Sequence, residues 1–282
     1  MDDLVSTAWL ADALGADDLA VIDASAHLPD AQRDARAEFL AAHIPGARFL
    51  DLASFTDAGS PAPSAVPNAA QFAERMAQLG IGPTDRIVIY DDSAVKTSAR
   101  AWFILRLHGA RQVAILDGGL GKWKAEGRPL ETGETEARAA PRFDATPGPG
   151  TIFTKQDMLA NLETGARQVV DARGPGRFSG AEGDFRADVA SGHIPQSRNL
   201  PFGRLLREDG TFKDAAGLSA AFAEAGVDPD RPVVTTCGGG VTAAVLLFAL
   251  HLLGKHDGAL YDGSWSEWGA DPSTPKATGM PA

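Results

Sequence analysis

Cys237 is the only cysteine of the 282 residues, and its neighbours place it where a thiol could act as a nucleophile. A β-branched run ends at Thr236, the glycines Gly238, Gly239 and Gly240 follow the cysteine, and a long apolar segment comes next. This order predicts a turn between a buried strand and a helix N-terminus, where backbone N–H groups and the helix dipole favour negative charge. Such a turn favours the thiolate and exposes backbone donors to an anionic ligand. The alternative is a small, inert buried thiol; the three glycines favour a functional one.

The chain repeats itself, and the repeat indicates which elements hold this turn. Three short motifs occur twice, in the same order and at nearly the same spacing: Val21-Ile22-Asp23 and Val169-Val170-Asp171, His43-Ile44-Pro45 and His193-Ile194-Pro195, and the turns Asp117-Gly118-Gly119 and Asp262-Gly263-Ser264 that lead to Trp123 and Trp268. Internal duplication predicts two equivalent structural units. The polar stretch rich in proline and glycine between them is typical of an exposed linker. We expect domains at residues 1–135 and 153–282, joined by a linker at 136–152.

Each half alternates short apolar strands with segments of helical periodicity. We expect strands at residues 20–23, 87–90, 113–116, 168–171, 232–236 and 259–261, and helices at 69–79, 98–107, 214–225 and 241–253. Strands that alternate with helices predict an α/β fold with a mainly parallel sheet covered on both faces. Ligands of such sheets bind beyond the carboxyl ends of the strands, and Cys237 lies at one of these ends.

The duplication also provides an internal control for the cysteine. By the spacing of the last motif, Cys237 corresponds to Asp92, so the first half is expected to keep the strand and the turn without the thiol. An acid at that position would repel an anionic substrate and cannot carry sulfur. The sequence therefore predicts that the second half holds the chemistry and the first half is scaffold.

Together these features resemble the tandem-domain rhodanese-type sulfurtransferases, and the resemblance covers nearly the whole chain. It rests on the Cys-Gly-Gly-Gly-Val-Thr-Ala sequence from Cys237, on both His-Ile-Pro motifs and on the turns that end at Trp123 and Trp268. It implies two tandem rhodanese-like domains, the first inactive and the second catalytic. It also implies a ping-pong reaction: Cys237 takes a sulfane sulfur from a small anionic donor, becomes a persulfide, and passes the sulfur to cyanide, a thiol or a protein thiol. No metal or organic cofactor is expected.

The resemblance further implies that Arg177 and Arg186 bind the donor. Arg177 matches a substrate-binding arginine of both mercaptopyruvate and thiosulfate enzymes, and Arg186 matches a second arginine typical of the mercaptopyruvate branch. A planar guanidinium can bind a carboxylate through two hydrogen bonds. Local cations are needed because a formal net charge of −11 would repel an anionic donor. The alternative for each arginine is an ordinary solvated surface position.

The residues after the cysteine bear on the choice of donor. Thiosulfate enzymes of this architecture carry an Arg-Lys pair there, whereas mercaptopyruvate enzymes have glycine first and usually serine or threonine second. The pattern favours 3-mercaptopyruvate, with thiosulfate as the alternative. We expect the donor to bind to Arg177 and Arg186 and to the turn residues Gly238, Gly239, Gly240, Val241 and Thr242.

Two departures from the family's pattern concern proton transfer. Gly239 lacks the usual hydroxyl, and Ser64 stands where the resemblance implies a histidine of the first domain. Both side chains proposed to relay protons are thus missing. A water molecule or Thr242 is the expected substitute.

Several other residues have motif partners in both halves. His43 and His193 invite a role as general bases, but their occurrence in the half without a thiol favours a structural role. Asp23 and Asp171 end equivalent strands and are expected to be structural, and Asp171 could organise Arg173 by ion pairing.

The tryptophans and the histidines outside these motifs suggest no further chemistry. Trp268 matches Trp123 and is expected in the core, whereas Trp265 replaces Leu120 and could line the active pocket. The six histidines and the single cysteine show no spacing typical of metal ligands, so no metal site is expected.

Two other functions are compatible with a cysteine on such a turn. Dual-specificity phosphatases use the same loop architecture, but their loop is one residue longer and ends in an arginine, whereas Thr242 and two alanines follow Val241 here. The non-enzymatic alternative is a protein that carries a persulfide without catalytic turnover. Retention of Cys237 together with Arg177 and Arg186 argues against it.

Composition limits the partners and the location. The excess of acidic over basic residues (37 against 26) argues against nucleic acid or an anionic membrane surface as partner. One cysteine cannot form an internal disulfide, and the acidic start of the chain is unlike a signal peptide. The apolar run at 241–253 is too short to span a bilayer. We therefore expect a cytoplasmic protein.

Overall fold

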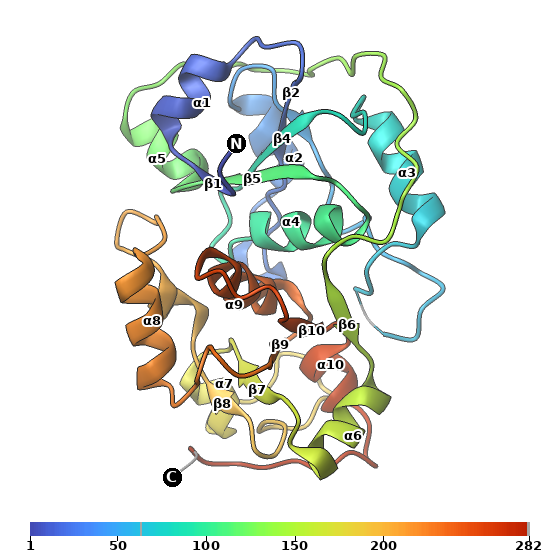
Figure 1. The fold of residues 1–282 in the computed structure, drawn as a ribbon, viewed down its shortest axis with the longest axis vertical. Helices are drawn as coiled ribbons and strands as arrows, with labels where there is room; N and C mark the ends of the chain where they lie inside the picture. The colour runs from blue at the N-terminus through green and yellow to red at the C-terminus, as the bar shows by residue number, and fades with distance from the viewer. Residues whose placement is uncertain (63, 281–282) are drawn as a thin grey trace. The chain divides into compact units, whose positions relative to one another are not determined.

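The computed structural model describes residues 1–62 and 64–280, which form two compact units (Figure 1). Unit 1 comprises Met1–Asp57, Val66–Pro149 and Glu208–Phe212. Unit 2 comprises Ala58–Ala65, Gly150–Arg207 and Lys213–Ala282. Each unit contains one five-stranded sheet, and in the described residues the neighbouring strands of both sheets are parallel.

The sheet of unit 1 has the strand order β1-β5-β4-β2-β3. Its strands are β1 (Leu4–Val5), β2 (Leu19–Asp23), β3 (Arg48–Phe49), β4 (Arg86–Tyr90) and β5 (Gln112–Leu116). Its helices are α1 (Thr7–Ala13), a 3-10 turn η1 (Pro29–Ala31), α2 (Ala35–Ala41), α3 (Ala69–Gln78), α4 (Ser98–Leu107) and α5 (Gly119–Ala125).

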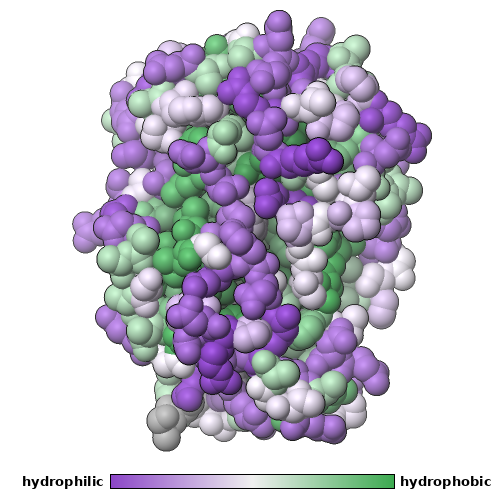
Figure 2. All heavy atoms as spheres, viewed as in Figure 1, coloured by the Kyte–Doolittle hydropathy of each residue, from purple (hydrophilic) through white to green (hydrophobic). Residues whose placement is uncertain are grey.

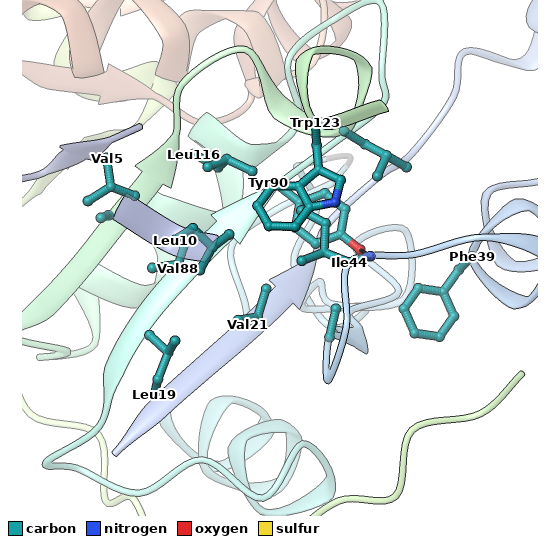
Figure 3. Close-up of a cluster of buried hydrophobic side chains, with 13 residues drawn as sticks. Val5, Leu10, Leu19, Val21, Phe39, Ile44, Val88, Tyr90, Leu116 and Trp123 are labelled. Atoms are coloured by element: carbon teal, nitrogen blue, oxygen red, sulfur yellow. Dashed lines mark hydrogen bonds between the residues drawn. The ribbon is translucent and has the colours of Figure 1, made fainter. Parts of the chain in front are cut away.

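Alternate strand residues of unit 1 form a core with α1, α2 and α5 on one face of the sheet (Figure 3). Val21 and Tyr90 point to this face and share the core with Leu10 of α1, Phe39 of α2 and Trp123 of α5. Burial of each such side chain stabilises the fold by about 1.5–3 kcal/mol. Helix α4 packs against β4 and β5.

The sheet of unit 2 repeats this topology in the order β6-β10-β9-β7-β8. Its strands are β6 (Thr151–Phe153), β7 (Gln168–Asp171), β8 (Arg198–Asn199), β9 (Val233–Thr236) and β10 (Ala259–Tyr261). Its helices are α6 (Lys155–Thr164), α7 (Pro175–Ser179), a 3-10 turn η2 (Phe202–Leu205), α8 (Ala215–Glu224), α9 (Val241–Leu252) and α10 (Ser264–Trp268). In each sheet the unit's first strand lies at one edge and is followed in space by its fifth, fourth, second and third strands. The two orders are therefore the same, as internal duplication predicts.

The core of unit 2 follows the same plan as that of unit 1. Met158 of α6 and Trp265 and Trp268 of α10 pack with Val234 and Tyr261 of the central strands. Helix α9 packs against β9 and β10, and its residues from Ala243 to Leu250 are buried. Strand β9 and helix α9 are thus both packed in the core. The turn between them, which carries Cys237, is therefore fixed at both of its ends.

Hydrophilic side chains cover much of the face shown in Figure 2, with hydrophobic side chains visible between them. Among the helices that the structure describes, none has both the length and the apolar character needed to cross a membrane.

Candidate active site

Cys237 directly follows β9 and lies on the turn into α9, with only 2% of its surface exposed. The start of α10 anchors this turn through backbone hydrogen bonds. Trp265 N–H donates to the Cys237 carbonyl (2.9 Å) and Ser266 N–H to the Gly238 carbonyl (2.8 Å). The N–H of Cys237 donates to Ser264 Oγ (3.2 Å). The backbone on both sides of the thiol is therefore held in place.

Gly240 sets the entry into α9. It has a φ of 79°, a left-handed conformation that strongly favours glycine, and it is the N-cap of the helix. The helix N-terminus and its positive dipole end therefore begin three residues after the thiol. Val241 and Thr242 form the first turn of α9, and both are half-buried. The predicted strand-to-helix turn at Cys237 agrees with this geometry.

Arg177 and Arg186 come together beside this turn. A Cβ placed on Gly238 would lie 3.4 Å from Nη2 of Arg177 and 3.5 Å from Nη2 of Arg186. Nη2 of Arg186 also donates to the Gly238 carbonyl (3.3 Å). The two arginines, which are nine residues apart in sequence, thus border the residue that follows the thiol. They are the predicted pair of donor-binding cations.

Asp184 connects the two arginines. Its Oδ2 accepts from Nη2 of Arg177 (2.5 Å) and from Nη2 of Arg186 (3.2 Å), and its Oδ1 accepts from Nε of Arg186 (2.8 Å). Burial raises the pKa of Asp184, but hydrogen bonds from Arg186 and Arg177 outweigh it and lower this pKa to about 2. The carboxyl is therefore ionised at any working pH. Sequence reasoning did not identify this residue.

Part of the hydrogen-bonding capacity of Arg177 is unused. Its buried Nε has no hydrogen-bond partner in the described part of the chain, and its Nη1 would lie 3.8 Å from a Cβ at position 238. A buried donor without an acceptor is costly in a folded protein. An anionic ligand on this side of Gly238 would supply the acceptor.

Phe185 covers the faces of both guanidinium groups. Its ring centroid is 4.6 Å from Cζ of Arg186 and 5.4 Å from Cζ of Arg177, and 65% of the residue is exposed. The cation–π contacts hold the planes of the guanidinium groups against the ring. The N–H groups at the edges of the two guanidinium groups are thus left to donate hydrogen bonds.

The structure corrects the expected equivalence between the two halves. Ala24 N–H donates to the Tyr90 carbonyl and Ala172 N–H to the Thr236 carbonyl, both at 2.9 Å, so the next residue in each half is equivalent. The residue of unit 1 that is equivalent to Cys237 is therefore Asp91 rather than Asp92. Leu120 N–H donates to the Asp91 carbonyl just as Trp265 N–H donates to that of Cys237.

Asp91 fills the turn of unit 1 with its own carboxylate. Oδ1 accepts from Ser93 N–H (2.9 Å) and Oδ2 from Ser98 N–H (2.9 Å), at the start of α4. An acid still stands where the thiol is in the other half, so unit 1 lacks the nucleophile as expected. Asp92, the residue first predicted, instead forms an ion pair with Arg33 (3.2 Å).

Ser64 belongs to the segment Ala58–Ala65, which groups with unit 2 rather than with the first half as expected. Its backbone is left-handed, with a φ of 58°. The neighbouring Pro63 lies outside the described residues.

His43 and His193 have the same surroundings in the two units. The Nδ1–H of each donates to a backbone carbonyl, that of Phe39 (2.8 Å) and that of Phe178 (2.9 Å), and each imidazole stacks on the same phenylalanine. Burial lowers the pKa of His193. An imidazole that makes the same contacts in both halves, including the half without the thiol, fits the structural role that the duplication predicted.

Asp171 and Arg173 form a buried ion pair at the end of β7. The carboxylate accepts from Nη2 (2.7 Å) and Nε (3.0 Å) of the guanidinium, and both side chains are at most 3% exposed. Cζ of Arg173 lies 4.7 Å from the ring centroid of Trp265, which is itself buried. Trp265 therefore contacts this ion pair with its ring and the carbonyl of Cys237 with its backbone N–H.

Trp268 and Trp123 occupy equivalent core positions. Their indole N–H groups donate to the carbonyls of Pro275 and Pro129, each at 2.8 Å. Within residues 1–62 and 64–280, no three His, Cys, Asp or Glu side chains gather in a way that could hold a metal ion.

Comparison with known proteins identifies the repeated unit. The family described as "Rhodanese-like domain" matches residues 6–126 and 154–271. The chain belongs to the rhodanese-like family. The match to both halves confirms the predicted fold, in which two tandem domains each have a parallel sheet flanked by helices.

Relatives that span nearly the whole chain carry sulfurtransferase names. The chain is 41% identical over 271 residues to 3-mercaptopyruvate sulfurtransferase of Homo sapiens, covering 94% of this chain and 91% of the relative. It is 37% identical to the enzyme of that name in Escherichia coli K12 (96% of each), and 40% identical to thiosulfate sulfurtransferase of Gallus gallus (94% and 92%). The predicted class, a sulfurtransferase, is confirmed.

Solved structures show the same two-domain fold. SseA from Escherichia coli, a 3-mercaptopyruvate sulfotransferase by its description, matches with a TM-score of 0.85 and 36% identity, covering 95% of this chain and all of that one. Tum1 from Saccharomyces cerevisiae matches with a TM-score of 0.86 and 29% identity over 94% of each chain.

Proposed function

We propose that this sulfurtransferase takes sulfur from 3-mercaptopyruvate through a persulfide on Cys237 and passes it to a thiol or to cyanide. The observation that carries the proposal is the pair Arg177 and Arg186 beside an uncharged Gly238. The arginines can bind the carboxylate of the donor, while the turn offers no cation to a second anionic group. Relatives named 3-mercaptopyruvate sulfurtransferase support the same donor.

The first half-reaction moves sulfur onto the enzyme. The Cys237 thiolate attacks the donor sulfur, the carbon–sulfur bond breaks, and pyruvate leaves as its enolate. The proton of the donor thiol passes to the enolate carbon, which leaves pyruvate and a persulfide anion. This balance requires no side-chain acid, and a water molecule or Thr242 can carry the proton in place of the hydroxyl that Gly239 lacks.

The second half-reaction returns the thiolate. An acceptor thiolate or cyanide attacks the outer sulfur, the sulfur–sulfur bond breaks, and Cys237 leaves as the thiolate. Thiolate and persulfide are both anions, so the N–H groups of the turn and the N-terminus of α9 stabilise both states. The same turn can serve the whole cycle without rearrangement.

Thiosulfate is the second candidate donor. The similarity to a thiosulfate sulfurtransferase at 40% identity favours it. Glycines at 238 and 239, in place of the Arg-Lys pair expected for a sulfonate, argue against it.

The decisive experiment compares both donors with cyanide as acceptor. We expect thiocyanate from 3-mercaptopyruvate with the higher kcat/KM, and a mass increase of one sulfur atom on the enzyme when the acceptor is left out. Cys237→Ser should abolish both signals, because serine cannot form a persulfide. Thiocyanate formation that survives this substitution would exclude Cys237 as the sulfur carrier, and persulfide without turnover would indicate a carrier.

Arg186→Ala separates the two donors. The substitution should raise the KM for 3-mercaptopyruvate by about tenfold or more, since a charge-assisted hydrogen bond is lost, and the KM for thiosulfate much less. Steady-state kinetics with matched cyanide concentrations measures both values. Equal effects on the two donors would remove the structural reason for preferring 3-mercaptopyruvate.

A further inference from the structure

Asp184 is a buried acid within the group of side chains that faces the donor. Its side chain is 2% exposed, whereas those of Arg177 and Arg186 are 27% and 30% exposed. Only the arginines can therefore reach a bound molecule, while the acid lies behind them. Two arginines and one ionised carboxyl carry a single net positive charge.

The hydrogen bonds of Asp184 also fix the direction of the cations. One carboxylate accepts from both guanidinium groups, and the N–H of Arg186 donates to its Oδ1 (3.1 Å). These hydrogen bonds between Asp184 and Arg186, two residues later, hold the short backbone segment between them in a fixed conformation. Nη1 of Arg177 would lie 3.8 Å from a Cβ at Gly238, and the buried Nε of Arg177 has no hydrogen-bond partner among the described residues.

We propose that Asp184 is a specificity-determining residue that restricts the arginine pair to donors with one negative charge. This inference rests on the proposed function and names the substrate class of the same site. A monocarboxylate such as 3-mercaptopyruvate neutralises the net charge of the three groups. A dianion such as thiosulfate leaves one negative charge unpaired in a partly buried site, which is unfavourable.

The test changes the charge of Asp184 and keeps its shape. Asp184→Asn should raise the ratio of kcat/KM for thiosulfate to kcat/KM for 3-mercaptopyruvate by about tenfold, because the site then carries two positive charges. The matched control is Asp188→Asn, which removes an exposed carboxyl from the same loop and should leave the ratio unchanged. If Asp184→Asn lowers both constants in proportion, the acid is only structural and the proposal is wrong.

Asp184→Glu provides the conservative variant. It keeps the charge but displaces the carboxylate, so activity should fall while the donor ratio stays near that of the unaltered protein. A ratio that moves as far with glutamate as with asparagine would attribute the effect to geometry and overturn the proposal.

A binding measurement on the unaltered protein tests the proposal without turnover. Alkylation of Cys237 by iodoacetamide should be slowed by pyruvate, a monoanion, at concentrations at which sulfate, a dianion, has no effect. Equal protection by both anions would overturn charge selection, even if Asp184→Asn does not fold. If neither donor is turned over but pyruvate alone protects, the proposed function fails and charge selection stands.

Discussion

At the scale of single residues, Gly238 and Gly239 are adjacent in sequence but differ in their surroundings. A Cβ at 238 would contact the guanidinium groups of Arg177 and Arg186, whereas a Cβ at 239 would meet no atom within 4 Å. Neither glycine has a left-handed backbone that would strain another residue. The space at Gly238 is therefore where we expect the donor carboxylate to approach the arginines.

This contrast gives a paired prediction. Gly238→Ala should raise the donor KM by about tenfold with little change in stability, because the methyl group occupies the space beside both arginines. Gly239→Ala should have a much smaller effect. Steady-state kinetics and thermal unfolding of both variants check this, and a larger KM effect for Gly239→Ala would place the donor elsewhere on the turn.

Most site residues could be predicted from the sequence because their types are informative. Cys237 and its glycines predict an anion-binding turn by themselves, and the family resemblance adds the two arginines. Asp184 could not be found in this way, because its pairing depends on how an irregular loop folds. Its position two residues before Arg186 was the only signal. The error of one residue at Asp92 arose because Leu120 comes 29 residues after Asp91, whereas its equivalent Trp265 comes 28 residues after Cys237.

At the scale of elements, the equivalent strands β2 and β7 end in acids with different partners. Asp171 at the end of β7 is paired with Arg173, whereas Asp23 at the end of β2 has Ser25 at the matching position. The ion pair lies under Trp265, whose backbone holds the Cys237 carbonyl. Unit 2 therefore has a charged support for its turn that unit 1 lacks.

Removing one partner of this pair should be costly. Arg173→Met leaves Asp171 as a buried, unpaired charge, so the free energy of unfolding of unit 2 should fall by about 3–5 kcal/mol. Urea unfolding measures the loss. The double variant Asp171→Asn with Arg173→Met should recover part of it, and a double-mutant cycle without coupling would contradict the role assigned to the pair.

The central elements were predictable, and the short ones were not. The observed bounds of β7, β10 and α4 equal the predicted ones, because each is a buried run ended by charge, glycine or proline. The strands β1, β3 and β8 have two residues each, too few to show the alternation of apolar and polar residues that predicts a strand. Strand β6 begins inside the polar stretch expected to be linker, and its pairing with β10 is a tertiary interaction that local sequence does not encode.

At the scale of the whole molecule, unit 1 is destabilised by the buried acid Asp23, which has Ser25 rather than an arginine two residues after it. This acid is 2% exposed, and burial raises its pKa from an ordinary value near 3.8 to about 6, against hydrogen bonds from Ser25. Between these two pH values the folded chain keeps a proton that the unfolded chain has lost. The free energy of unfolding therefore falls as the pH rises from 4 to 6, and the penalty is complete above 6.

Asp23→Asn should remove this penalty. At pH 8 the variant should be more stable than the unaltered chain by up to about 2–3 kcal/mol, and near pH 4 the two should differ little. Calorimetric unfolding at both pH values checks the sign. Because the two units need not unfold together, the shift should appear in the transition of unit 1, and a shift that is larger at pH 4 would contradict the assignment.

The carboxylate of Asp91 has a consequence for experiments on the catalytic turn. The turn of unit 1 holds the side chain of Asp91, bonded to the N–H groups of Ser93 and Ser98, whereas the turn of unit 2 gains and gives up sulfur in the proposed cycle. One molecule thus contains a constant and a variable version of the same structure. The amides of Ser93 and Ser98 can serve as an internal standard, against which the hydrogen exchange of the turn after Cys237 reports how much of the enzyme is loaded with sulfur.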